Sequence, residues 1–340
     1  MYQNPLTAAA DLARNEPPHC YAEEAWLKLL RATHPTQRIY SSDPFVEVYS
    51  FAQCLYGLMF PLLDTGGFGW MWLIDGPERA MLIDTGYGLG DLQGLCRDIT
   101  GGKPLMVVNT HCSCDHSYGN CQFSQVYCHE LLAADLDWKQ DPRIWDYLFQ
   151  ADGSCLCVPF DRRDLVPFRR YQIIGVPDGY RFDLGQGHEV ELIWTPGHQP
   201  GHAAYLDLAG RFLIGGDCVG CGAVSVSGGS DFHADPRHAR DPFQGSRYPS
   251  WDPRRTVAAQ REGLHRLASR LEAFDRVFCG HGIQDLSSQL IPALLAACDR
   301  VLAQPENCNL IQPDGRHCID VPGSGQLCYY LNGVGKRTDI

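Results

Sequence analysis

The residues best suited to chemistry gather in one short stretch, His-Cys-Ser-Cys-Asp-His at positions 111–116. It places two imidazoles and a carboxylate at the spacing of metal ligands. The stretch directly follows an apolar run at 105–108, which predicts a strand that delivers these side chains into a loop. This pattern indicates a site for a divalent cation.

Three later segments add further donors, and each of them also follows an apolar run. They contribute His198, Asp217 and His281, each preceded by a glycine. Neutral imidazole suits zinc or iron, and carboxylates neutralise the charge of the cation. We expect the four strand ends to converge on one pocket that holds a metal centre.

The order of these motifs resembles the metallo-β-lactamase superfamily, in which His-x-His-x-Asp-His is followed by a Gly-His, a Gly-Asp and a final Gly-His. The stretch 82–86, Leu-Ile-Asp-Thr-Gly, resembles the aspartate turn that supports the ligands in that family. One position departs from the pattern, because Ser113 stands where the second histidine is expected. The resemblance spans about residues 39–281 and implies an α+β fold, a four-layer αββα sandwich.

The resemblance also implies a role for each residue of the site. The implied metal ligands are His111, Asp115, His116, His198, Asp217 and His281. They would hold one or two Zn2+ ions, with the carboxylate of Asp217 bridging both positions. By the same resemblance Asp115 is the general acid and base. The residues expected to support the ligands are Asp84, Ser113 and His202.

The serine leaves the first metal position with three protein ligands, His111, His198 and Asp217. Three ligands and an open position match a catalytic zinc. The same trio matches the 2-His-1-carboxylate face of non-haem Fe(II) enzymes. Because the superfamily includes iron-dependent sulfur dioxygenases, a mononuclear Fe2+ oxidoreductase of that type stays open beside the zinc hydrolase.

A thiol replacing the missing imidazole is the less favoured interpretation. In an extended loop, Cys112 and Cys114 would point away from the face shared by positions 111, 113 and 115. The 16 cysteines are spread along the chain without the dense spacing of a disulfide scaffold, which is typical of reduced thiols.

The first hypothesis for function is a metal-dependent hydrolase that cleaves an ester, lactone or thioester of a small-molecule metabolite through a metal-bound hydroxide. Glutathione thioesters are not favoured, because the family's enzymes for them carry a basic C-terminal patch and residues 304–340 contain only three Lys or Arg residues. A binding module that kept the fold but lost the chemistry is a third hypothesis. The retention of all six other donors in register argues against it.

The composition limits the partners. A formal net charge of −12 disfavours nucleic-acid binding, which depends on clustered Lys and Arg. No run approaches the ~20 apolar residues of a membrane span, and the N-terminus does not read as a secretory leader. We therefore expect a cytoplasmic protein with a small-molecule substrate and no nucleic-acid or membrane partner.

The chain divides by pattern into three parts. Residues 1–37 are expected to form an N-terminal helical arm, residues 38–303 the catalytic domain, and residues 304–340 C-terminal strands that pack on the same domain. The arm and the tail favour a homodimer. Within the domain, residues 129–138 and 142–150 show helical patterns.

A long loop rich in Gly, Ser, Asp, Pro and aromatic residues spans about 219–254. Loops of this length are usually functional or mobile, so we interpret it as a lid over the metal site. The candidate substrate contacts on it are Phe232, His233, Tyr248 and Trp251. A packed surface loop anchored by its aromatic residues is an equally good interpretation.

Overall fold

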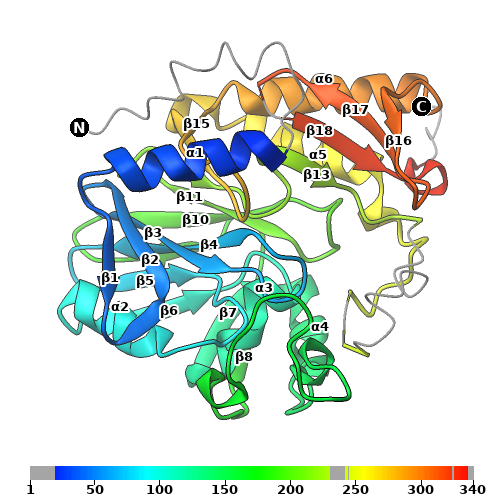
Figure 1. The fold of residues 1–340 in the computed structure, drawn as a ribbon. Helices are drawn as coiled ribbons and strands as arrows, with labels where there is room; N and C mark the ends of the chain where they lie inside the picture. The colour runs from blue at the N-terminus through cyan, green and yellow to red at the C-terminus, as the bar shows by residue number, and fades with distance from the viewer. Residues whose placement is uncertain (1–19, 230–241, 244, 324, 336–340) are drawn as a thin grey trace.

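The computed structural model describes residues 20–229, 242–243, 245–323 and 325–335. Two β-sheets face each other, and helices cover the outer face of each (Figure 1). This arrangement confirms the predicted α+β sandwich with its αββα layers.

The first sheet has eight strands in chain order. They are β1 (Arg38–Tyr40), β2 (Asp43–Ala52), β3 (Leu55–Pro61), β4 (Phe68–Asp75), β5 (Ala80–Ile83), β6 (Leu105–Val108), β7 (Gln125–His129) and β8 (Gln172–Val176). The pairs from β1 to β5 are antiparallel and those from β5 to β8 are parallel. Since β5 and β6 are parallel neighbours, the Asp84 turn and the 111–116 stretch leave the sheet at the same edge.

The second sheet has the order β15-β14-β12-β11-β10-β9. Its strands are β9 (Arg181–Asp183), β10 (Glu189–Trp194), β11 (Ala203–Asp207), β12 (Phe212–Ile214), β14 (Arg276–Phe278) and β15 (Leu286–Ser287). Strands β12 and β14 run parallel. Asp217 and His281 follow these two strands, so they also leave their sheet at one edge.

Strand β4 shows how the layers pack. Trp70 and Trp72 point into the core between the sheets, where their rings stack with centroids 5.7 Å apart. Met71 and Leu73 point to the other side, into the core beneath α2 (Leu92–Thr100) and α4 (Ala133–Trp138). Because successive strand residues face opposite sides, the strand is apolar throughout when both faces are buried. A third core lies between the second sheet, α5 (Val257–Ala268) and α6 (Leu290–Ala303).

The predicted N-terminal helix is present as α1 (Cys20–Thr33) and lies across the sandwich (Figure 1). Trp26 and Leu30 are each 1% exposed and belong to the core between the sheets. Four residues apart, they occupy one face of the helix. The helix therefore packs on its own chain. The domain boundaries and the homodimer stay predictions.

Part of the predicted lid is a strand. Strand β13 (Gly222–Ser225) pairs in parallel with β18 (Gly325–Tyr329). The same sheet continues through β17 (His317–Val321) to β16 (Leu310–Ile311). The loop interpretation is wrong for these four residues, because the partner strand that completes their hydrogen bonds lies in the distant C-terminal tail.

The helical pattern at 142–150 was misleading. Only a 3-10 turn, Asp146–Leu148, forms there. The backbone pairs with the next segment instead, since Leu156 N donates to Leu148 O at 2.7 Å. At 129–138, the α-helix begins only at Ala133. None of the helices in the described ranges is long and apolar enough to cross a bilayer.

Candidate metal centre

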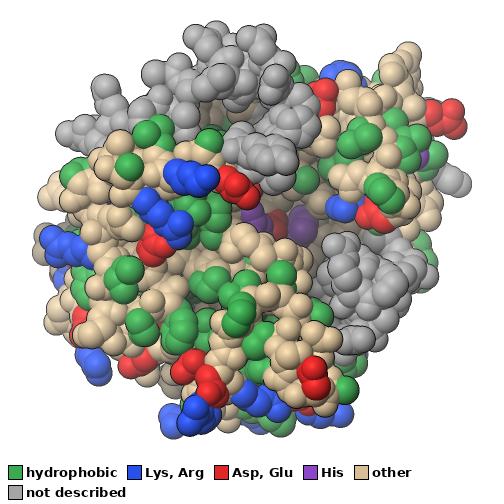
Figure 2. Space-filling view, in the orientation of Figure 1, with side chains coloured by type: hydrophobic (Ala, Val, Ile, Leu, Met, Phe, Trp, Pro, Cys, Tyr) green, Lys and Arg blue, Asp and Glu red, His purple; other side chains and the backbone are tan. Residues whose placement is uncertain are grey.

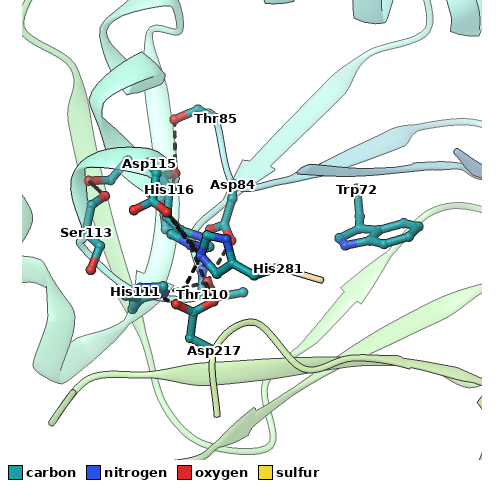
Figure 3. A network of polar contacts seen from close by, with 12 residues as sticks. Trp72, Asp84, Thr85, Thr110, His111, Ser113, Asp115, His116, Asp217 and His281 are labelled. Carbon is teal, nitrogen blue, oxygen red and sulfur yellow. Dashed lines mark hydrogen bonds and ion pairs between the residues drawn. The ribbon is translucent and has the colours of Figure 1, made fainter. Parts of the chain in front are cut away.

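The six predicted ligands meet at the edge where the strands of both sheets end (Figure 3). Those that follow β6, β10, β12 and β14 are His111, His198, Asp217 and His281. The other two, Asp115 and His116, lie on a one-turn helix, α3 (Cys114–Ser117). The predicted convergence of four strand ends is therefore what the structure shows.

The donor atoms form two groups of three. The first group is His111, His198 and Asp217, and the second is Asp115, His116 and His281. Within each group the donor atoms lie within 4.8 Å of one another. A third group of possible donors, Cys54, His188 and Asp207, lies outside these motifs. In it, Nε2 of His188 lies 2.8 Å from Oδ2 of Asp207, so these two side chains have each other as partners.

Asp217 stands between the first two groups. Its Oδ2 lies 3.7 Å from Nε2 of His111 and 3.8 Å from Nε2 of His198. The same oxygen lies 3.3 Å from Nε2 of His281, in the other group. One carboxylate thus faces both groups, which is the position that the predicted bridging ligand requires.

The second group is the tighter of the two. Asp115 Oδ2 lies 3.1 Å from Nε2 of His281 and 3.4 Å from Nε2 of His116. The two imidazole nitrogens are 3.2 Å apart. Nitrogen and carboxylate donors that converge on one point suit zinc or iron.

The donor set fits a cation on a second, independent ground. Nε2 of His111 and Oδ1 of Asp217 are buried and have no hydrogen-bond partner among the described residues. Buried polar atoms in native structures nearly always have a partner. A cation between these side chains would satisfy both atoms.

Asp84 orients two of the donors, as predicted for a supporting residue. Its backbone has a φ of 65°, in the turn after β5. Asp84 Oδ2 lies 2.8 Å from Nδ1 of His116 and accepts from the hydroxyl of Thr110 at 2.7 Å. That hydroxyl lies 3.0 Å from Nδ1 of His111. Because the Nδ1 atoms are engaged, the Nε2 atoms are left to face a cation.

The second sheet's donors have supports of their own. Nδ1 of His198 lies 2.8 Å from the carbonyl oxygen of Ser225 on β13, so the third sheet positions this ring. His202 belongs to neither donor group. Its Nε2 accepts from the backbone N–H of Asp217 at 3.2 Å, and its Nδ1 lies 2.8 Å from the hydroxyl of Thr195. This placement suits the supporting role predicted for it.

Ser113 lies apart from the donors around Asp217 (Figure 3). Its hydroxyl accepts from Nε2 of Gln199 at 3.1 Å. The extended loop ends at this residue, because α3 begins at Cys114. The thiol of Cys112 donates to Gln199 Oε1 at 3.0 Å. Sequence reasoning missed Gln199, whose only signal is its place next to His198.

Neighbouring groups of opposite charge shift the pKa values of Asp217 and His281 at the centre. Burial alone would raise the pKa of Asp217, but His281, His116 and His111 hold it well below its usual range. Burial would likewise lower the pKa of His281, yet Asp217 and Asp115 raise it to about 10. The metal-free centre therefore carries a proton that a cation must displace.

Access to the centre is from the side of His281. Figure 2 shows histidine and acidic side chains at the bottom of a hollow in the surface. The side chain of His281 is 34% exposed, whereas those of His111 and His116 are 0% exposed. A substrate would therefore meet the second donor group first.

Sequence reasoning also missed Glu23, which reaches the centre from α1. Its Oε1 lies 3.0 Å from the position that a Cβ would take on Gly282, next to His281. Burial raises the pKa of Glu23, and the charge of His281 opposes that rise. No motif marks this glutamate, because only the packing of α1 on the sandwich brings it here.

The predicted substrate contacts are described only in part. Phe232 and His233 lie outside the described residues. The hydroxyl of Tyr248 donates to the carbonyl oxygen of Leu131 at 3.0 Å, and Trp251 is 78% exposed. The packed-loop interpretation therefore fits Tyr248, whereas Trp251 is too exposed to anchor the loop by packing. Substrate contact by any of the four stays a prediction.

The family comparison agrees with this fold and donor set. The model of the Metallo-beta-lactamase superfamily matches residues 64–262, more than half of the chain. The chain belongs to the metallo-beta-lactamase superfamily, which confirms the predicted family. Membership implies that a divalent metal is bound, and the two donor groups are where it would be held.

Individual relatives match a smaller part of the chain. It is similar to the acyl-coenzyme A thioesterase MBLAC2 of Bos taurus, with 29% identity over 175 residues, and to that of Homo sapiens, with 28% over 175 residues. Each match covers 47% of this chain and 62% of the relative, so it spans less than two thirds of these relatives. Among solved structures, a metallo-beta-lactamase from Pontibacter korlensis covers 75% of this chain and 99% of its own, with 16% identity and a TM-score of 0.49.

Replacing Asp84 with Asn should weaken metal binding by about 10- to 100-fold, the usual effect of losing a residue that orients a ligand. The amide no longer provides a second carboxylate oxygen for His116 and Thr110. Affinity is measured by competition with a chromophoric chelator. The control is Asp135→Asn, since Asp135 is equally buried but bonds Ser246 and Arg247 instead of a donor. Equal affinities for the two variants would contradict the orienting role.

Metal binding should release at least about one proton per chain at pH 7, because the raised pKa of His281 keeps its imidazole protonated and a ligand must be neutral. Apparent affinity should accordingly rise as the pH increases from 6 to 9. Calorimetric titrations at pH 7 in two buffers of different ionisation enthalpy count the protons. Identical heats in both buffers would contradict this prediction.

Proposed function

We propose that the protein is a metal-dependent hydrolase of small-molecule acyl compounds, and that thioesters are its substrates. The observation that carries the proposal is the pair of donor groups that share Asp217, whose Oδ2 lies 3.3–3.8 Å from imidazoles of both groups. Two adjacent cation positions are the arrangement used for hydrolytic attack. Two zinc ions are the proposed complement.

The choice of a thioester over an ester or lactone rests on the relatives. Both mammalian relatives described above carry the name acyl-coenzyme A thioesterase. Their matched segments cover less than two thirds of each relative, so the activity is proposed for this chain and not transferred to it. The net charge of −12 supports a small molecule over a nucleic acid as the substrate.

In such a reaction, the two donor groups would hold the cations and Asp115 would transfer protons. Cations held by the two groups would polarise the substrate carbonyl and lower the pKa of a water molecule. Asp115 is the proposed proton carrier, since its carboxylate lies at the centre and is 13% exposed. His116 and His281 hold its pKa well below the usual range against the effect of burial, so the carboxylate is ionised. It would accept a proton from water and return it to the leaving group.

A mononuclear iron oxidoreductase is the second candidate. The observation in its favour is the trio His111, His198 and Asp217, which forms a 2-His-1-carboxylate group while Ser113 bonds Gln199. The equally well assembled second group favours the binuclear hydrolase. The cytoplasmic location and the homodimer stay predictions.

Replacing Asp115 with Asn should lower kcat for a thioester by about 100-fold or more, the range of general acid–base catalysis. The loss should be larger for the matching oxygen ester, because a thiol has a pKa of about 8.5 and its thiolate leaves with less need of a proton than an alkoxide. Steady-state kinetics on both substrates test this, with metal content measured on each sample. Equal losses on both substrates at equal metal content would contradict the proton-carrier role.

Protein purified without added metal should contain close to two zinc ions per chain by elemental mass spectrometry, and removal of the metal should abolish thioester hydrolysis. The Ser113→His variant should keep this content, because the side chain at position 113 lies apart from the donors around Asp217 and bonds Gln199. About one iron per chain, with oxygen uptake in place of hydrolysis, would overturn the hydrolase in favour of the second candidate.

A further inference from the structure

A cavity of about 610 Å³ lies between α1 and the turn that joins β3 to β4. Its apolar lining includes Leu27 of α1, Met59 and Pro61 of β3, and Phe68 of β4. Leu27 and Phe68 are only partly buried and pack against the core between the sheets. The cavity is therefore an apolar opening at the edge of that core. Its size lies within the range of ligand sites, roughly 300–1,000 Å³.

Strand β4 joins the cavity to the metal centre. Gly69, next to Phe68, forms an isolated β-bridge with His281, and Trp70 N donates to Gly280 O at 2.8 Å. His281 is also the most exposed of the six donors, since the other side chains are 16% exposed or less. The cavity wall at Phe68 is thus joined through the backbone to the segment that carries the most exposed donor.

The charged groups of the cavity disfavour an anion. Arg31 is engaged by Glu47, with its Nε 3.0 Å from both carboxylate oxygens. The other charged lining residues of the cavity are Glu23 and Glu24. Carboxylates repel phosphate groups most strongly where water is partly excluded. The carboxylates thus disfavour a nucleotide, and the apolar lining favours an apolar chain.

We propose that this cavity binds the acyl chain of the substrate, with the reacting carbonyl at the His281 side and the leaving group directed away from α1. The assignment rests on the proposed thioester hydrolysis and names which half of the substrate enters the cavity. Glu23 lies at the boundary, lining the cavity and contacting the segment around Gly282. It disfavours anionic acyl chains, and the apolar lining favours an uncharged alkyl chain as the ligand class.

The test uses full-length, metal-loaded protein and a neutral series of acyl thioesters of N-acetylcysteamine from acetyl to decanoyl. Each methylene that enters the cavity should raise kcat/KM about fourfold, the factor that corresponds to about 0.8 kcal/mol per buried methylene. Leu27→Trp, which fills the cavity, should lower kcat/KM at least tenfold for the decanoyl substrate and less than twofold for the acetyl one. Lys28→Trp is the matched control, since Lys28 is the exposed neighbour on the same helix.

A second variant and a second measurement keep the outcomes separate. Leu27→Ala enlarges the cavity and should move the preferred chain to a longer one. Calorimetry with S-octyl and S-ethyl thioethers of N-acetylcysteamine, which cannot be hydrolysed, should show tighter binding of the longer chain, and Leu27→Trp should remove the difference.

The experiments distinguish failure of the proposed function from failure of the cavity assignment. Thioether affinity that depends on chain length and on Leu27, with no thioester hydrolysed, would overturn the proposed function while supporting the alkyl site. Thioesters hydrolysed at rates independent of chain length, with all Leu27 variants alike and thioethers bound equally, would overturn the cavity assignment and leave the hydrolase intact.

Discussion

The structure depends on the close packing of oppositely charged donors at one buried point. Charges interact strongly over a few ångströms in a weakly polar interior, so each carboxylate there must be matched by several imidazoles. Asp217 achieves this by lying within 3.8 Å of three rings that follow three different strands. The buried donor atoms that no described hydrogen bond satisfies are the ones that a cation would satisfy.

The three sheets together position the donors of the metal centre. The first sheet delivers His111 and its supports Asp84 and Thr110, and the second delivers Asp217. The third sheet acts more indirectly: β13 presents the Ser225 carbonyl to His198, and β13 is itself fixed by pairing with β18. The C-terminal tail is therefore part of the support of the metal centre.

The shape and the charge of the surface around the metal centre restrict the class of substrate that can reach it. Donors at the bottom of a hollow admit only a substrate that can bring its reacting group inward. The cavity beside α1 combines apolar walls with the carboxylates of Glu23 and Glu24, which suits an uncharged acyl group better than a phosphate or a nucleic acid. An acyl compound attacked at its carbonyl is the substrate that we propose from the donor set and this cavity.

The order and spacing of the motifs in the sequence indicated the family, and the resemblance implied the layered fold and the six candidate donors, because residue types and spacings are local properties of the chain. It did not determine that Ser113 bonds Gln199, that residues 222–225 form a strand, that 142–150 is not a helix, or that Glu23 lies beside Gly282. Each of these depends on contacts between residues far apart along the chain. Only tertiary packing sets such distances, since no local pattern records which distant partner completes a hydrogen bond.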